Sequence, residues 1–211
     1  MYLCHCTRPH RRKRIVLTGG PGAGKTAVLE LARQHFCKHV LVLPESAGIL
    51  FGGGFPRGAQ TFEREAAQRA IYRIQCELET IADHRDDVAV VLCDRGTVDG
   101  AAYWPEGPVS FWDALGTTHD AELSRYDAVI HLRTPAPSTY NHANPLRIES
   151  ALEASAIDAR IEASWDRHPL RETIESTPNF LEKAARAAGA RLSARAKYPP
   201  YAASTCTRAP W

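Results

Sequence analysis

Short apolar runs along the chain alternate with segments in which apolar residues recur at helical spacing. Four of these runs predict buried strands, because each is short, rich in Val, Ile and Leu, and followed by polar residues or glycine. They cover residues 15–17, 40–43, 88–93 and 128–132, and a weaker fifth run lies in LRETIES. Strands that alternate with helices predict an α/β fold, with a doubly wound parallel five-stranded sheet flanked by helices.

Between the strands, helical spacing predicts a long helix over about 61–83 and a polar, alanine-rich helix from Arg147 to about Arg167. A last helix is expected in PNFLEKAARAAG, which ends at a glycine stop. One apolar stripe of the long helix is expected to face the core. The stripe consists of Ile71, Ile74, Leu78 and Ile81.

The first chemical signal is a glycine-rich stretch directly after the first strand. Its spacing, G-x-x-x-x-G-K-[ST], is that of a phosphate-binding loop, and a helix follows it. Glycines leave backbone N–H groups free to surround phosphate oxygens, and the helix offers its positive N-terminal end to the same anion. The expected nucleotide-binding residues are Gly19, Gly20, Pro21, Gly22, Ala23, Gly24, Lys25, Thr26 and Ala27.

Within this loop, two side chains have expected roles of their own. Lys25 is predicted to reach the β- and γ-phosphates of ATP, and the Thr26 hydroxyl is predicted to hold Mg²⁺. Because ligands of such sheets bind beyond the carboxyl ends of the strands, residues that follow the other strands are the next candidates.

Three charged residues occupy such positions. Asp94 and Arg95 follow the third strand, where a carboxylate can hold Mg²⁺ and a guanidinium can meet the phosphate oxygens in transfer. Glu45 follows the second strand, where it can accept the proton of an attacking hydroxyl. The alternatives are a turn aspartate with a surface ion pair, and an ordinary glutamate at a strand end.

The connection after the fourth strand, TPAPSTYNHANPLRIES, is rich in proline and small polar residues and predicts a mobile lid. Arg147 is expected to supply positive charge from this lid, with Arg160 as a second candidate. Arg147 is equally well explained as a solvated residue at the start of a helix.

Composition sets the limits of the domain and of its partners. The 211 residues, 44% of them hydrophobic, suit one domain over 14–189, with a basic arm over 1–13 and a poorly ordered tail over 190–211. A net charge of +2 predicts no nucleic-acid partner. No apolar run is as long as a membrane span, the N-terminus lacks a secretory apolar core, and a cytoplasmic location is expected.

Taken together, RIVLTGGPGAGKTAVLELA, VLPES, VVLCDRGTVDGAAYW and YDAVIHLRTP…NPLRIES resemble the small AAA-like, phosphate-loop, kinase-type ATP-binding proteins grouped near ribosylnicotinamide kinase. The resemblance spans about residues 14–188. It implies that Asp94 and Arg95 match the aspartate-arginine pair of deoxynucleoside and thymidylate kinases, and that Glu45 takes the place of their catalytic carboxylate. DRG here replaces their more usual DRS or DRY.

Other phosphate-loop classes lack support, because the chain has no guanine-recognition motif, no transporter signature and no helical lid domain of a ring motor. Two hypotheses remain. One is a kinase that transfers the γ-phosphate of Mg-ATP to a small hydroxyl-bearing acceptor, for which the resemblance implies a nucleoside-like molecule. The other is an ATP-binding switch that binds a partner or an anionic lipid through the basic arm. The kinase needs an acceptor pocket, which the loop FGGGFPRG and nearby aromatics can line beside Gln68 and Asp99. Aromatics in such numbers are more often core residues, but packing explains the glycine-rich loop less well. The aromatics are Phe51, Phe55, Phe62, Tyr103, Trp104, Phe111 and Trp112.

Overall fold

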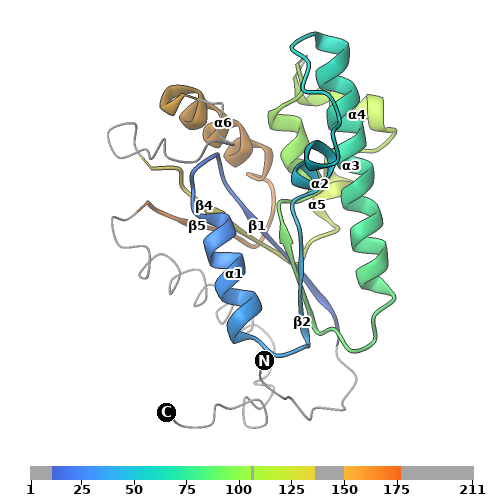
Figure 1. Cartoon of the computed structure of the whole chain (residues 1–211), viewed down its shortest axis with the longest axis vertical. Coiled ribbons are helices and arrows are strands. Elements are labelled where there is room, and N and C mark those ends of the chain that lie inside the picture. Colours follow the sequence, from blue (N-terminus) through green and yellow to red (C-terminus); the bar gives the residue numbers. More distant parts are fainter. Residues whose placement is uncertain (1–10, 106, 136–149, 177–211) are drawn as a thin grey trace.

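A computed structural model describes residues 11–105, 107–135 and 150–176. Its centre is a five-stranded sheet in the order β2-β3-β1-β4-β5, and all four strand pairs are parallel. Helices lie on both sides of this sheet (Figure 1). The predicted α/β fold with a doubly wound parallel sheet is therefore confirmed.

The strands lie close to where the apolar runs placed them. They are β1 (Lys13–Thr18), β2 (Val40–Leu43), β3 (Val90–Asp94), β4 (Ala128–Leu132) and β5 (Arg171–Ile174). Their carboxyl ends lie at one edge of the sheet, because every strand pair is parallel. That edge is the upper one in Figure 1, where β1 leads into the start of α1.

The helices include several that the sequence did not predict. The described ones are α1 (Lys25–His35), α2 (Ser46–Gly52), α3 (Thr61–Asp83), the 3₁₀ helix η1 (Thr97–Ala102), α4 (Pro108–Leu115), α5 (His119–Leu123) and α6 (Ala151–Ser164). Helix α3 has the predicted bounds, whereas α6 begins at Ala151 after its cap Ser150. The expected last helix and residues 136–149 of the expected lid lie outside the described residues.

Alternating residues of the strands bury both faces of the sheet. On β1, Val16 packs in a cluster with residues of α3, α4, α5 and α6, whereas Ile15 and Leu17 pack with Val28 and Leu29 of α1. This alternation follows from the two-residue period of a strand. Helix α1 thus covers one face of the sheet, and residues of α3, α4, α5 and α6 pack on the other.

The core-facing stripe predicted for α3 is wrong at its C-terminal end. Ile81 is 61% exposed. The buried residues of this helix are Ala67, Tyr72, Gln75, Glu79 and Ala82. Polar side chains face inwards because they join a buried hydrogen-bond network, which hydrophobic spacing alone cannot reveal.

This network centres on Glu79, which is 1% exposed. Its carboxylate accepts hydrogen bonds from Gln75 (2.9 Å), Tyr126 (2.7 Å) and Arg125 (2.5 Å). Arg14 adds an ion pair at 3.3 Å. The network joins α3 to β1 and to the segment before β4, and through Gln75 it reaches Ser46, the residue after Glu45.

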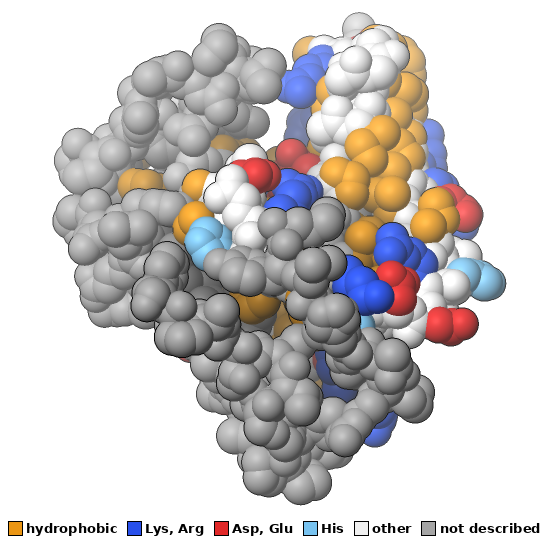
Figure 2. All heavy atoms as spheres, turned by 60° about the horizontal axis from the view of Figure 1, so that its bottom comes forward, with side chains coloured by type: hydrophobic (Ala, Val, Ile, Leu, Met, Phe, Trp, Pro, Cys, Tyr) orange, Lys and Arg blue, Asp and Glu red, His pale blue; other side chains and the backbone are white. Residues whose placement is uncertain are grey.

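Basic residues at the start of β1 are paired with acidic ones. Lys13 Nζ lies 2.5 Å from Asp127, and Arg12 lies 3.7 Å from Asp83. Figure 2 brings this end of the molecule forward and shows Lys and Arg side chains beside Asp and Glu side chains. Among the described residues, no helix is long and apolar enough to cross a membrane.

Candidate active site

The phosphate loop leaves β1 through a backbone turn that only glycine fits. Gly19 has φ 131°, and a Cβ atom there would lie 2.0 Å from the backbone oxygen of Leu132 in β4. Gly22 and Gly24 also have positive φ, at 78° and 90°. The glycines of the motif therefore let the chain turn against β4 and enter α1.

Lys25, the first residue of α1, turns back across this loop. Its Nζ donates hydrogen bonds to the oxygens of Gly19 (2.8 Å) and Gly20 (2.9 Å). Burial, and then the positive charge of Arg95, lower the pKa of Lys25 to about 8. An ammonium in this environment gains strongly from an added negative charge, which fits the expected contact with phosphates.

The N-terminus of α1 is open to a ligand in the described part of the chain. Its cap, Gly24, offers no side chain, and no other side-chain cap is present. The Thr26 residue in the first turn is exposed. First-turn N–H groups and this hydroxyl are thus available for phosphate oxygens and Mg²⁺.

Asp94 ends β3 beside β1, in register with Leu17. The residue is 8% exposed, and its Oδ1 is buried with no hydrogen-bond partner among the described residues. Burial raises the pKa of Asp94 to about 6, although the charge of Lys25 opposes this shift. A buried carboxylate oxygen without a partner costs stability, and a cation would satisfy it, so the donor set of Asp94 and Thr26 fits Mg²⁺.

Arg95 connects the ends of three strands. Its Nε lies 2.8 Å from Oε1 of Glu45, which caps α2 after β2. Its Nη1 donates to the oxygen of Gly19 at 3.1 Å, and its own N–H donates to the oxygen of Leu17 at 3.1 Å. The structure therefore brings together the predicted Lys25, Glu45, Asp94 and Arg95, while the catalytic role of each stays a prediction.

The Glu45 carboxylate is held in its charged form. Burial alone would raise its pKa, but the charge and hydrogen bond of Arg95, together with Lys25, lower the pKa below its ordinary value. Because Arg95 takes Oε1, the second oxygen is left to accept a further hydrogen bond.

Three of the seven candidate pocket aromatics are core residues in the structure. Trp104, Phe111 and Trp112 belong to the hydrophobic core and do not line a surface site. Phe62 is 66% exposed. Asp99 is also buried, and its carboxylate accepts hydrogen bonds from Thr18, Gly96 and Trp165.

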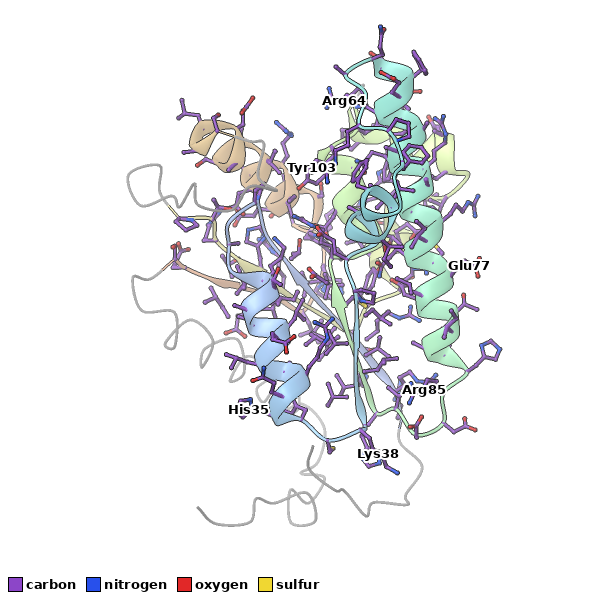
Figure 3. All side chains as sticks on the ribbon, in the orientation of Figure 1. His35, Lys38, Arg64, Glu77, Arg85 and Tyr103 are labelled. Atoms are coloured by element: carbon purple, nitrogen blue, oxygen red, sulfur yellow. The ribbon has the colours of Figure 1, made fainter. Side chains whose placement is uncertain are left out.

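Two aromatics remain near the strand ends, each with an arginine. Arg57 lies over the ring of Phe51 at 4.2 Å, and Arg95 lies over the ring of Tyr103 at 5.7 Å. Arg64, near Tyr103 in Figure 3, donates a hydrogen bond to the backbone oxygen of Tyr103 at 3.3 Å. Arg95 thus lies between the Tyr103 ring and the Glu45 carboxylate as a partner of both, and Arg57 adds a positive charge near Glu45.

Of the two lid arginines, Arg147 lies outside the described residues. Arg160 lies on α6 and donates from Nε to the oxygen of Ala102 at 2.8 Å. It therefore supports the end of η1 in this structure. Its predicted contact with phosphates stays a prediction.

One pair of buried residues near the loop escaped the sequence analysis. Asp158 of α6 accepts a hydrogen bond from the backbone N–H of Gly20 at 2.7 Å, and its Oδ1 lies 3.0 Å from His131 Nε2. The sequence holds one signal of this pair, since His131 interrupts the otherwise apolar strand AVIHL.

Comparison with known proteins supports the same fold. No curated protein matches the chain. Among solved structures, thymidylate kinase from Candida albicans is similar, with a TM-score of 0.59 and 12% identity over 88% of this chain and 93% of that one. A family model described as an AAA domain matches residues 14–183. The chain therefore belongs to this AAA domain family and has the fold of a phosphate-loop kinase.

Proposed function

We propose that the protein is a kinase that binds Mg-ATP and transfers the γ-phosphate to a small hydroxyl-bearing acceptor. The observation that carries the proposal is the buried Oδ1 of Asp94, which has no hydrogen-bond partner among the described residues and lies near the charges of Lys25, Glu45 and Arg95. A second carboxylate, Glu45, is held near this group by its ion pair with Arg95, and transfer to a hydroxyl needs a group that accepts the proton. The kinase fold of the similar solved structure adds support.

In the proposed reaction the site residues act on the phosphates, on Mg²⁺ and on the acceptor proton. Loop N–H groups and Lys25 hold the β- and γ-phosphates, and Arg95 neutralises charge on the oxygens of the γ-phosphate. Thr26 and Asp94 would hold Mg²⁺, which supplies further positive charge to the phosphates. The acceptor oxygen bonds to the γ-phosphorus, the bond from that phosphorus to the β–γ bridging oxygen breaks, and the acceptor proton passes to Glu45.

The acceptor is proposed to be small and nucleoside-like, since aromatic and arginine side chains lie near Glu45 and Arg95. We also propose a cytoplasmic location and no nucleic-acid partner, as the sequence predicts. The alternative, a switch that binds an anionic partner through the basic arm, loses support at two arm residues, because Arg12 and Lys13 are already paired with Asp83 and Asp127.

A screen of acceptors tests the proposal. ADP release from Mg-ATP is measured with and without nucleosides, ribosylnicotinamide and phosphoinositides, for the parent protein and Glu45→Gln. The kinase proposal expects at least one acceptor to stimulate release by the parent, and Glu45→Gln to abolish that stimulation. If no acceptor stimulates the parent and both proteins hydrolyse ATP at one rate, the switch replaces the kinase.

A further inference from the structure

The backbone of the phosphate loop is tied to α6 by one buried carboxylate. Asp158, 4% exposed, accepts the Gly20 N–H at 2.7 Å on Oδ1. The same carboxylate accepts the backbone N–H of Thr134 at 3.3 Å on Oδ2. One side chain thus joins three segments: the loop after β1, the end of β4, and a helix more than a hundred residues later in the chain.

The space around Gly20 shows how closely these segments fit. A Cβ atom on Gly20 would lie 2.5 Å from the Thr134 hydroxyl, 2.8 Å from Asp158 Cβ and 3.0 Å from the oxygen of Ala154. The Thr134 hydroxyl also donates to the oxygen of Pro21 at 3.2 Å. The first half of the loop therefore lies against α6 with no room for a side chain, and a shift of either part displaces the other.

His131 completes the carboxylate's surroundings. It is fully buried, and its Nε2 lies 3.0 Å from Asp158 Oδ1. Since a carboxylate only accepts hydrogen bonds, Nε2 carries the proton in this contact. Arg133 lies 3.7 Å from Oδ2 and balances the negative charge. Although burial alone would raise the pKa of Asp158, the hydrogen bonds from His131 and Gly20 lower it, so the carboxylate stays charged.

We propose that Asp158, fixed by His131, is a positioning residue that sets the phosphate loop in its nucleotide-binding conformation and couples that loop to α6. This inference rests on the proposed binding of Mg-ATP. Asp158 holds the N–H at the start of the loop, so the later N–H groups, at the N-terminus of α1, remain available to phosphates. Pre-organised donors bind an anion more tightly than donors that must be ordered at the time of binding.

The matched control is Glu162, one turn further along α6. Its carboxylate accepts a hydrogen bond from Arg133 at 2.7 Å and pairs with Arg171 at 3.5 Å, but no hydrogen bond or ion pair joins it to the phosphate loop in the described structure. Removal of either carboxylate deletes an acidic side chain of α6 that pairs with Arg133. Only Asp158→Ala, however, frees the loop, so a comparison with Glu162→Ala separates positioning of the loop from general support of α6.

The test has two readouts on the full-length protein. In the nucleotide-free state, NMR hydrogen exchange of the Gly20 amide should be slow in the parent and in Glu162→Ala, and at least about tenfold faster in Asp158→Ala. Calorimetry with Mg-ATP should give a Kd about tenfold higher for Asp158→Ala than for the parent, with less than about a twofold change for Glu162→Ala. Thermal melting defines a temperature at which all three proteins are folded. Asp158→Asn, which keeps the shape but loses an acceptor, should fall between.

Unchanged exchange of Gly20 in folded Asp158→Ala overturns the inference, as does an unchanged Kd. A parent protein that binds no Mg-ATP contradicts the proposed function. Even then, equal exchange rates in the parent and Asp158→Ala would separately exclude the contact between Asp158 and the loop.

Discussion

Glu45 and Arg95 form an ion pair, with 2.8 Å between Oε1 and Nε, that joins the ends of β2 and β3 beside the phosphate loop. The pair has two consequences for chemistry. It fixes the proposed base, and it holds the guanidinium that would meet the γ-phosphate. A guanidinium fixed in advance stabilises transition-state charge without the cost of reorganisation.

The first prediction concerns the proposed base. Glu45→Gln should slow acceptor-stimulated ADP release by ~10²–10⁴-fold, the usual effect of losing a general base. ATP affinity should change little, because the side chain faces the acceptor. Calorimetry and a coupled ADP assay measure the two quantities. An equal loss of affinity and rate would instead indicate that the main work of Glu45 is to hold Arg95 in place.

The second prediction concerns Lys25, whose pKa is lowered to about 8 by burial. Near pH 8.5 most of this amine is neutral in the nucleotide-free protein, and bound phosphates favour its charged form. ATP binding at this pH should therefore take up a proton. Calorimetry in buffers with different ionisation enthalpies measures that uptake.

Lys25→Met provides the control, because it removes the titrating group and keeps the length of the chain. The variant should show no such uptake, and turnover should fall by about 10²–10³-fold. Proton uptake that persists in Lys25→Met would show that another group titrates.

The third prediction follows from the raised pKa of Asp94, about 6 against an ordinary 3.8. Mg²⁺ needs the carboxylate, so the Mg²⁺ concentration for half-maximal activity should rise as pH falls below about 6. Activity measured across pH 5 to 8 at several Mg²⁺ concentrations checks this. In Asp94→Asn, half-maximal activity should require more Mg²⁺ at pH 7.5, and this dependence on pH should disappear.

The same shift has an effect on stability, with a sign opposite to that of an ordinary salt-bridged aspartate. Since the folded pKa exceeds the unfolded one, the contribution of this group to stability is largest below about pH 4 and declines as pH rises through about 6. Asp94→Asn should therefore stabilise the nucleotide-free protein at pH 7.5, by roughly 1–2 kcal/mol. Urea unfolding at pH 7.5 without Mg²⁺ measures it, and a destabilised variant would contradict the assignment of a costly buried charge.

The last prediction concerns Gly19, where a Cβ would meet the oxygen of Leu132 at 2.0 Å in a backbone with φ 131°. Gly19→Ala should lower the free energy of unfolding by ~2–4 kcal/mol and weaken Mg-ATP binding, because the loop must move away from β4. Gly52→Ala is the control, since a Cβ there meets nothing within 4 Å. If the loss of stability in Gly19→Ala is no larger than that in Gly52→Ala, the loop tolerates a side chain at Gly19.

Much of the fold could be predicted because it rests on local patterns. Strands β1 to β4 each contain a mostly apolar run, and the bounds of β2, β4 and α3 match those predicted. Long apolar runs and long periodic segments report their burial directly. Short helices such as α2 and α4 carry too few residues for a periodic signal, so the sequence showed a loop or nothing there.

The site was less predictable where contacts cross the fold. Motif spacing located Lys25 and Thr26, and strand ends indicated Glu45, Asp94 and Arg95. The sequence could not indicate that Asp158 reaches Gly20, because that contact depends on how α6 packs against the sheet. For the same reason, the sequence leaves open whether Trp104, Phe111 and Trp112 belong to the core or line a pocket, since composition does not distinguish a buried ring from an exposed one.

The buried carboxylate of Glu79 has a consequence for how this family member can change over generations. Loss of Glu79 alone would remove the carboxylate that the guanidinium groups of Arg14 and Arg125 share, at 3.3 Å and 2.5 Å. It would leave each arginine with one acidic partner, Asp83 for Arg14 and Glu122 for Arg125. Removal of one member of a buried ionic group costs more than an apolar replacement of the whole group. We therefore expect the three positions to be inherited together or replaced together, so that relatives carrying an apolar residue in place of Glu79 also lack both arginines.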